Sequence, residues 1–173
     1  FISDTQVNKT VDEDTLVDIA RLTRNSVEYF SHDPVIAMVS YSNFGSGREE
    51  ECLTVRKAVE RMQTMYPDLA IDGEMGLNYA LNSNLRDTTF PFNRLNGQEV
   101  NTLIFPNLSA ATTAFRTMLE MGLGDAIGPI QMGLNKPVHF ISVNAGVRDI
   151  INLATIASLD AAVLERNSTP IDK

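Results

Sequence analysis

Short apolar runs bounded by turn-forming residues alternate along the chain with longer stretches in which apolar positions recur every three or four residues. A short bounded run is typical of a buried strand, and the longer period is typical of a helix with one apolar face. We therefore expect strands at 1–5, 35–41, 69–72, 100–106 and 138–142. The alternation of strands with helices predicts an α/β fold with a mainly parallel sheet.

Four helices are predicted, each with one apolar stripe that can pack on the sheet. The stripes are Leu16, Ile19, Ala20, Thr23, Val27 and Phe30; Val55, Ala58, Val59, Met62 and Met65; Ala111, Ala114, Phe115, Met118 and Leu119; and Val147, Ile150, Ile151, Ala154 and Ala157. Pro67 should stop the second helix, and Gly122 with Gly124 should end the third. Residues 76–98 predict a short helix followed by a loop, and residues 166–173 predict a flexible tail.

Composition and charge narrow the classes of protein that fit. The 173 residues are 43% apolar and 21% charged, which suits one ordinary globular domain. No apolar run approaches the roughly 18 residues of a membrane span and nothing resembles a signal segment, so a cytoplasmic location is expected. A net charge of -8 without Lys/Arg clusters argues against nucleic acid as a partner. Because the chain begins with Phe1 in a strand-like run, we interpret it as a piece of a longer polypeptide.

The usual signatures of metal, nucleotide and hydrolase sites are missing. Cys52 is the only cysteine and the chain has 2 histidines, so neither an internal disulfide nor a Cys/His zinc spacing is possible. The stretch GSGREE has Glu50 in place of the third glycine of a dinucleotide fingerprint, and no phosphate-loop lysine follows. HExxH and GxSxG motifs are absent as well. We expect no metal site, and we interpret Cys52 and His139 as structural residues.

Three predicted strands end in small polar corners that each open a helix: SYSNFGSG at 40–47, FPNLSA at 105–110 and ISVNAG at 141–146. In a parallel sheet these corners share the carboxyl edge, where open α/β sheets bind ligands. Helix N-termini at that edge offer free amide groups that suit phosphate or carboxylate. The candidate ligand-binding residues are Ser42, Asn43, Gly45, Ser46, Arg94, Asn107, Ser142 and Asn144.

Each corner also has a simpler interpretation. Ser and Asn are favoured N-caps, worth about 1 kcal/mol each, and a cap needs no ligand. Arg94, Arg148 and Lys136 are candidate cations for a crevice, although each also suits a solvated surface. Asp149, in the first turn of the last helix, fits either a role in orienting a thiol or amide or a simple preference for the helix N-terminus. Three corners with paired glycines together favour a binding crevice.

Four stretches, IDGEM, VNTLIFPNLSAATTAFRTMLEMG, AIGPIQMGLNKPVH and VRDIINLATIASLDA, follow one another along the chain. In this order they resemble the phosphate acetyl/butyryl transferase family, most closely the C-terminal phosphotransacetylase-like domain of large bacterial NADP-dependent malic enzymes. SYSNFGS, DGEM and FPFNRLNG favour the malic-enzyme branch over free-standing transferases. The resemblance runs from Phe1 to about Ala162. It implies that residues 1–165 are the later half of that domain, with the earlier half and the malic-enzyme catalytic domain upstream.

The resemblance also implies roles for the last polar corner. Ser142 falls on the serine that would hydrogen-bond the acyl carbonyl as it becomes an oxyanion, and Asp149 falls on the aspartate thought to help deprotonate the CoA thiol. Val143 falls on the family arginine, and Asn144 falls on a glycine. A bidentate guanidinium is the usual partner of a phosphate dianion, and valine has no donor. Loss of one preorganised donor costs on the order of 10²- to 10³-fold in rate.

The fold implied by the resemblance is an α/β three-layer αβα sandwich with a mainly parallel sheet, similar to isocitrate/isopropylmalate dehydrogenases. The implied function is that of a non-catalytic, oligomer-forming domain of an NADP-dependent malic enzyme that binds acetyl-CoA, or a related acyl-CoA, as an allosteric regulator. NADP and a divalent metal are expected only in the upstream malic-enzyme domain. No cofactor, nucleic acid or membrane is expected to bind this domain.

Two other hypotheses stay open. In the first, the domain is a working phosphate acetyltransferase that moves an acetyl group between CoA and phosphate, and Arg94 or a residue upstream of Phe1 replaces the missing cation. In the second, the domain serves assembly alone and binds no acyl-CoA.

Overall fold

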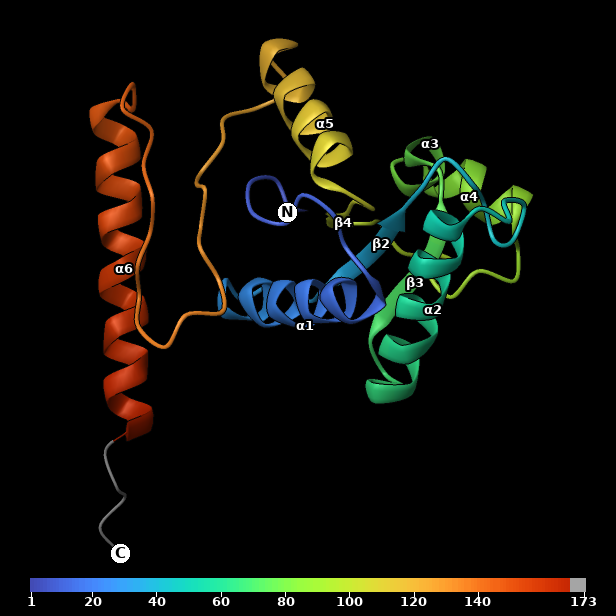
Figure 1. The fold of residues 1–173 in the computed structure, drawn as a ribbon, viewed down its shortest axis with the longest axis horizontal. Helices are drawn as coiled ribbons and strands as arrows, with labels where there is room; N and C mark the ends of the chain where they lie inside the picture. The colour runs from blue at the N-terminus through green and yellow to red at the C-terminus, as the bar shows by residue number, and fades with distance from the viewer. Residues whose placement is uncertain (169–173) are drawn as a thin grey trace, which may run out of the picture. The chain divides into compact units, whose positions relative to one another are not determined.

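The computed structural model describes residues 1–168 and divides the chain into two compact units, Phe1–Thr117 and Met118–Lys173. In chain order the elements are β1 (Ile2–Ser3), α1 (Glu13–Tyr29), β2 (Val35–Val39), α2 (Glu50–Met65), β3 (Ala70–Met75), α3 (Leu77–Ala80), α4 (Ser83–Thr89), β4 (Thr102–Ile104), α5 (Leu108–Glu120) and α6 (Val147–Ser168) (Figure 1). Among the described residues, no helix has both the length and the apolar composition that a membrane crossing requires.

The first unit is built on one 4-stranded sheet with the order β1-β4-β2-β3. Every neighbouring pair is parallel, with Ile2 opposite Leu103 and Ile36 opposite both Thr102 and Ile71. Because the strands all run in one direction, the segments that follow them meet at a single carboxyl edge. This confirms the predicted α/β fold with a parallel sheet.

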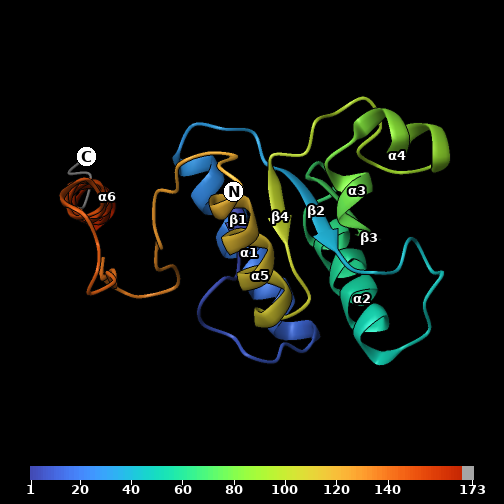
Figure 2. The same ribbon diagram turned by 90° about the horizontal axis from the view of Figure 1, so that it is seen from above.

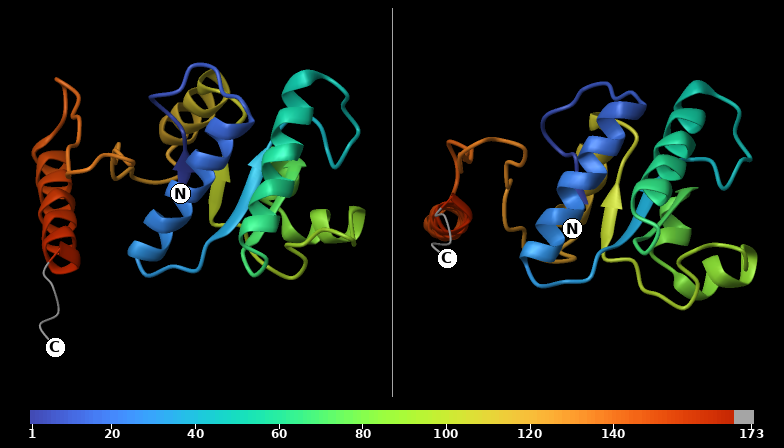
Figure 3. Two further views of the ribbon diagram at one scale, coloured as in Figure 1. Left: turned by 60° about the horizontal axis from the view of Figure 1, so that its bottom comes forward. Right: turned by 90° about the horizontal axis from the view of Figure 1, so that it is seen from below.

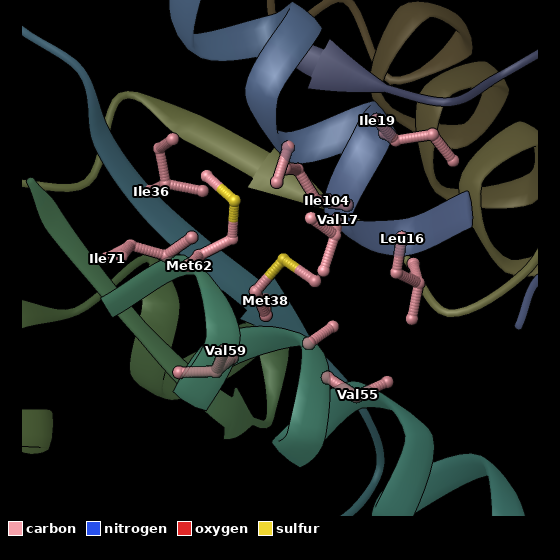
Figure 4. Close-up of a cluster of buried hydrophobic side chains, with 12 residues drawn as sticks. Leu16, Val17, Ile19, Ile36, Met38, Val55, Val59, Met62, Ile71 and Ile104 are labelled. Atoms are coloured by element: carbon pink, nitrogen blue, oxygen red, sulfur yellow. The ribbon is translucent and has the colours of Figure 1, made fainter. Parts of the chain in front are cut away.

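The core lies between this sheet and two helices, α1 and α2, that cover one of its faces (Figure 4). Its buried members are Leu16, Val17, Ile19 and Ala20 of α1; Val55, Ala58, Val59 and Met62 of α2; and Ile36, Met38, Ile71 and Ile104 of the strands. Helix α5 lies on the opposite face of the sheet (Figures 2 and 3). The first two predicted stripes are therefore core-facing over most of their length, while Met65 at the end of the second is 49% exposed. Each large side chain buried there contributes about 1.5–3 kcal/mol.

The ends of the helices follow local chemistry. The Asp12 side chain caps α1 by accepting a hydrogen bond from the Thr15 amide at 2.8 Å. Helix α2 ends at Met65, two residues before Pro67, as predicted. After α5, Gly122 adopts a left-handed conformation with φ 69°. Residues 76–98 form two short helices, α3 and α4, where one was predicted, and then a loop.

The second unit contains α6 and an extended segment that runs alongside it (Figure 1). His139 of that segment lies 3.4 Å from the Asp160 carboxylate of α6, and Leu153 and Ile156 are the buried apolar residues of this helix in the described range. Helix α6 continues through residues 166–168, the first three positions of the predicted tail, and residues 169–173 lie outside the described residues.

Two predictions about this unit are wrong. Residues 138–142 form no strand, because a strand needs a neighbour with which its backbone groups can pair and no described segment pairs with them. The stripe predicted to pack on the sheet is also largely uncovered, since Val147, Ile150 and Ile151 are 73%, 53% and 59% exposed. The helical period predicted α6 itself correctly, but which of its faces is buried depends on tertiary neighbours that the period does not specify.

Candidate functional site

The segment that follows β2, residues 40–47, is the first predicted corner, and it folds over the carboxyl end of β3. The Asn43 side chain accepts a hydrogen bond from the Gly76 amide at 2.7 Å, which ties the corner to the end of β3. Gly47 packs so closely that a Cβ there would lie 2.9 Å from the Ser42 hydroxyl oxygen, so only glycine fits. The corner is therefore a compact turn held against the neighbouring strand.

Glu74 of β3 is the centre of this corner. Its side chain is fully buried, and its Oε1 accepts from the Ser42 hydroxyl at 2.8 Å and the Gly45 amide at 2.9 Å. Arg56 of α2 donates to both carboxylate oxygens, at 2.9 and 3.1 Å. Burial alone would raise the pKa of Glu74, but the hydrogen bonds from Arg56, the Gly45 amide and Ser42 hold that pKa below its ordinary value. The buried, charged Glu74 thus holds the loop at residues 40–47 in place through hydrogen bonds.

The backbone amides of the corner are used internally. The amides of Phe44 and Gly45 donate to the carbonyl and to Oε1 of Glu74. The amide of Asn43 donates to Ser46 Oγ, that of Ser46 to the Asn43 carbonyl, and that of Gly47 to Ser42 Oγ. The amides of this turn are therefore not free for an anion, whereas the N-cap residue of α2, Glu49, makes no capping hydrogen bond with its side chain. Glu74 supplies acceptors from a strand distant in sequence, and the first turn of α2 carries Glu50 and Glu51, which disfavour an approaching anion.

The second corner follows β4, and there Asn107 caps a helix. Its Oδ1 accepts from the Ala110 amide at 2.9 Å, while its Nδ2 donates to Glu51 of α2 at 2.9 Å. This is the capping role that was the simpler interpretation. Asn107 also lines a cavity of about 300 Å3 at the carboxyl edge, together with Thr10, Val11, Asp12, Leu16, Glu50, Glu51, Thr54, Val55 and Pro106.

The cavity is acidic, with three carboxylates in its lining from Asp12, Glu50 and Glu51. Its lining contains no arginine or lysine. Such a surface repels a phosphate dianion, even though helix N-termini border it. Of the candidate ligand-binding residues only Asn107 lines this cavity. The cavity is therefore not the predicted crevice, which stays a prediction.

The third corner opens α6 in the second unit. The Asp149 carboxylate accepts from the Gly146 amide at 2.9 Å and so closes the first turn of the helix, while the Ser142 hydroxyl accepts from the Asn144 amide at a long 3.4 Å. Val143 is completely exposed. This corner does not end a strand. The first two corners follow β2 and β4 of the sheet, and the third belongs to the other unit.

The predicted cations have other partners or lie in solvent. Arg94 donates through its guanidinium to the Pro67 carbonyl at 2.7 Å, next to the amino end of β3 and not its carboxyl end. Arg148 pairs with Asp125 at 2.9 Å on the surface of the second unit. Lys136 is exposed. Arg94 thus does not join Ser42 and its neighbours in the structure.

Two further residues were interpreted as structural. The side chain of His139 is 4% exposed, and its Nδ1 accepts a hydrogen bond from the Gln131 amide at 3.1 Å, which links two parts of the extended segment. Cys52 is buried, with its sulfur 3.7 Å from the Ser40 hydroxyl. In residues 1–168, no group of three or more His, Cys, Asp or Glu is arranged to hold a metal ion.

Comparison with known proteins decides the family. The model of the family described as phosphate acetyl/butaryl transferase matches residues 1–158. The chain belongs to this family. Its fold agrees: a phosphotransacetylase from Streptococcus pyogenes superimposes with a TM-score of 0.86 at 36% identity over 92% of this chain, and the EutD phosphotransacetylase from Staphylococcus aureus with 0.83 at 29% identity over 92% of this chain. The chain covers 48% and 49% of those two structures.

The relatives of this transferase-family chain include two kinds of protein. The NADP-dependent malic enzyme of Salmonella typhimurium is 36% identical over 172 residues, which are 99% of this chain and 22% of that enzyme. The phosphate acetyltransferase of Bacillus subtilis is 31% identical over 159 residues, 92% of this chain and 49% of that protein. The chain therefore spans about a fifth of the malic enzymes and about half of the transferases that it matches.

Sequence reasoning missed the residues that organise the first corner. Neither Glu74 nor Arg56 was a candidate, although Glu74 stands in the strand AIDGEM between buried residues. A carboxylate in a run that otherwise reads as buried strand needs a partner, and that was the available signal. The identity of the partner depends on the packing of α2 against β3. The roles of Ser142 and Asp149 within the family stay predictions.

Proposed function

We propose that this chain is the later half of the phosphotransacetylase-like part of an NADP-dependent malic enzyme. In this proposal it binds acetyl-CoA, or a related acyl-CoA, as an allosteric regulator and does not transfer acetyl groups to phosphate. The observation that carries the proposal is Val143, which lies fully exposed between Ser142 and Asn144, where the family is expected to offer a guanidinium. A valine donates no hydrogen bond to an acyl phosphate.

The charges of the other corners support the same conclusion. The amides of 43–47 are bonded within the protein, partly to Glu74, and the first turn of α2 carries Glu50 and Glu51, which disfavour an anion there. The cavity at the carboxyl edge is lined by three carboxylates. Two like charges 4 Å apart near a protein surface repel by about 4 kcal/mol. A phosphate dianion is thus disfavoured at this cavity, whereas the thioester group of acetyl-CoA is neutral. The phosphates of CoA must bind elsewhere.

An acyl-CoA remains a suitable ligand. The Ser142 hydroxyl accepts from the Asn144 amide, and its own hydrogen stays available to donate to a thioester carbonyl. Asp149 caps α6 through Gly146 and needs no proton transfer for that role. The pantetheine and adenine parts of CoA supply binding area that does not depend on a cation at position 143.

Regulation requires that acetyl-CoA bind two states of the enzyme with different affinity, typically by about 1–3 kcal/mol. The malic-enzyme part would carry NADP, the divalent metal and malate, and acetyl-CoA formed downstream of malate-derived pyruvate would act as a feedback signal. A cytoplasmic homo-oligomer is the setting that we propose. Malic-enzyme relatives that match 93–99% of this chain support the attachment to such a catalytic part.

An active phosphate acetyltransferase is the alternative, and the match to the Bacillus subtilis phosphate acetyltransferase favours it. It requires a replacement for the missing cation. Arg94 donates to Pro67 and Arg148 pairs with Asp125, so the cation would be the exposed Lys136 or a residue from outside this chain.

The test uses the complete polypeptide that contains this chain. Calorimetry should show acetyl-CoA binding, and the same concentration range should change the rate of malate oxidation. Acetyl-CoA that binds without altering malate oxidation would remove the regulatory role. Absence of binding would favour a domain that serves assembly alone.

A second experiment restores the missing charge. Val143→Arg should raise thioester formation from acetyl phosphate and CoA if the remaining site is intact. Val163→Arg is the matched control, because it adds the same charge to another exposed valine of the same unit. Equal activity of the two variants would show that the site has diverged beyond position 143.

A further inference from the structure

Four aromatic rings from three separate segments gather on the surface of the first unit. The aromatic cluster consists of Phe44 after β2, Tyr79 of α3, and Phe90 and Phe92 after α4. Ring centroids are 4.9 Å apart for Phe44 and Phe90, 5.3 Å for Phe44 and Phe92, 5.0 Å for Tyr79 and Phe90, and 6.0 Å for Phe90 and Phe92. Phe92 remains 69% exposed, and the other three rings are half-buried.

The backbone of Phe44 is held in an unfavourable conformation beneath its ring. Its φ is 43°, in the left-handed region that bulky side chains rarely adopt. Glu74 fixes this turn twice, because its carbonyl accepts from the Phe44 amide at 2.8 Å and its carboxylate accepts from the Gly45 amide at 2.9 Å. Strained residues that the surroundings hold in place tend to mark functional positions.

The loop that carries Phe92 is locked as well. Arg86 is fully buried, and its Nη2 donates to the carbonyls of Leu95 and Gln98, both at 2.7 Å. Asn93 donates to the Phe90 carbonyl at 2.7 Å. Arg86 Nη1 and Asn93 Oδ1 are buried without a hydrogen-bond partner. This surface loop therefore retains two unsatisfied polar atoms, which folded proteins rarely leave unpaired.

These features present an exposed aromatic ring on a rigid backbone. Preorganised aromatic side chains dominate the binding energy of interfaces, because little conformational freedom is lost when they dock. The exposed ring of Phe92 adds little to the core of this unit, so its rigid support suits contact with another surface.

We propose that the aromatic cluster docks against the malic-enzyme part of the same polypeptide, in a depression lined by uncharged, mainly apolar side chains. The proposal rests on the proposed function, because it requires that the chain belong to a malic enzyme. The cluster offers one exposed ring and three half-buried rings, far less than the roughly 800 Å2 per partner of a stable independent interface. A covalently attached partner needs no such area, since the linkage supplies a high effective concentration.

The available chain agrees with that occupant. The sequence corresponds to 22% of the Salmonella typhimurium malic enzyme, so most of such a polypeptide lies outside it. The loop at residues 40–47 connects the aromatic cluster to the candidate ligand residues. Phe44 lies between Asn43 and Gly45 in this loop, and Glu74 binds both Gly45 and Ser42. A change at this loop can therefore alter the position of the docked ring.

A photocross-linking experiment on the complete polypeptide tests the docking. The photoreactive amino acid p-benzoylphenylalanine replaces Phe92 in one sample and Met65 in the control, because Met65 is an apolar residue 49% exposed on α2, outside the cluster. Mass spectrometry should find cross-links from position 92, and not from position 65, to residues of the malic-enzyme part. Cross-links to a second copy of this chain, cross-links to the first half of the transferase-like domain, or no cross-links would each overturn the proposal.

A functional measurement separates the docking from the proposed function. Phe92→Ala should leave the calorimetric affinity for acetyl-CoA within about twofold, while the effect of acetyl-CoA on malate oxidation falls toward none; typical couplings of this kind are about 5- to 150-fold. Met65→Ala should retain the full effect. If acetyl-CoA changes malate oxidation in Phe92→Ala as much as in the unaltered protein, the docking is contradicted and the proposed function is not. If the unaltered protein does not bind acetyl-CoA, the proposed function is contradicted, and the cross-linking result alone decides the docking.

Discussion

The Arg56 guanidinium donates two hydrogen bonds to the Glu74 carboxylate, from Nη2 to Oε1 at 2.9 Å and from Nε to Oε2 at 3.1 Å. The Glu74 side chain is fully buried, whereas 29% of the Arg56 side chain reaches solvent. Through this pair, α2 and β3 together hold the loop that follows β2. Removing either partner leaves buried hydrogen-bonding groups unpaired, which is more costly than the pair itself is stabilising.

Glu74→Gln should loosen this corner. The amide keeps the shape of the side chain but loses the charge that faces Arg56, and charge-assisted hydrogen bonds contribute about 1.5–3 kcal/mol. Hydrogen exchange of peptides that cover β2 and β3 in the complete polypeptide should report a loss of that size in local stability. Glu28→Gln, which breaks the exposed pair between Arg24 and Glu28, is the control and should leave these peptides unchanged.

The stabilisation from Glu74 should depend on pH in a defined direction. The folded pKa lies below the ordinary value of 4.5, so the carboxylate stabilises the fold fully above that value. The contribution is then lost as the pH falls through the lowered folded pKa. Urea unfolding of the unaltered protein and of Glu74→Gln should therefore show a stability difference that shrinks as the pH drops below 4.5. A difference independent of pH would mean that the variant acts by disturbing packing.

Gly73→Ala should damage the pairing of β2 with β3. A Cβ at Gly73 would lie 2.5 Å from the Met38 carbonyl oxygen, and its φ of 148° already disfavours other residues. We expect a destabilisation of about 3 kcal/mol or more, measured by urea unfolding. Gly97→Ala is the matched control, since Gly97 also has a positive φ but has nothing within 4 Å; only the conformational cost of about 1–2 kcal/mol should appear there. Equal losses would show that the close approach to Met38 is unimportant.

Asn107→Asp tests the contact between α5 and α2. Aspartate is as good an N-cap as asparagine, so the cap to Ala110 should survive. The new carboxylate would, however, face Glu51, whose oxygen now accepts from the Asn107 amide group at 2.9 Å. The variant should be less stable than Asn107→Ser at pH 7, and high salt should narrow the gap because it screens the repulsion. A variant as stable as Asn107→Ser would argue that the Glu51 contact is dispensable.

The elements with the clearest periodicity were predictable from the sequence. The spacing of Leu16, Ala20 and Val27 specified the buried face of α1, and Pro67 fixed the end of α2. Strand β3 was predicted at 69–72 but covers Ala70–Met75, and the buried Glu74 within it is paired with Arg56 of α2. Local pattern thus specifies an element where its burial is simple, and not where a distant side chain compensates a charge.

The candidate site was less predictable. Asn107 was found from its place before a helix, and its capping contact follows from local chemistry. The bonded amides of 43–47 were not foreseen, since their acceptors come partly from Glu74, a residue of another strand. The strand at 138–142 failed for a related reason: an apolar run becomes a strand only when a neighbouring strand pairs with it.

The central claim is that the corner at Val143 no longer supports transfer to phosphate. The most direct measurement is the rate at which the complete polypeptide forms acetyl-CoA from acetyl phosphate and CoA, compared under the same conditions with the phosphotransacetylase of Streptococcus pyogenes. The missing guanidinium predicts a rate lower by at least a factor on the order of 10². A rate equal to that of the Streptococcus pyogenes enzyme would contradict the account.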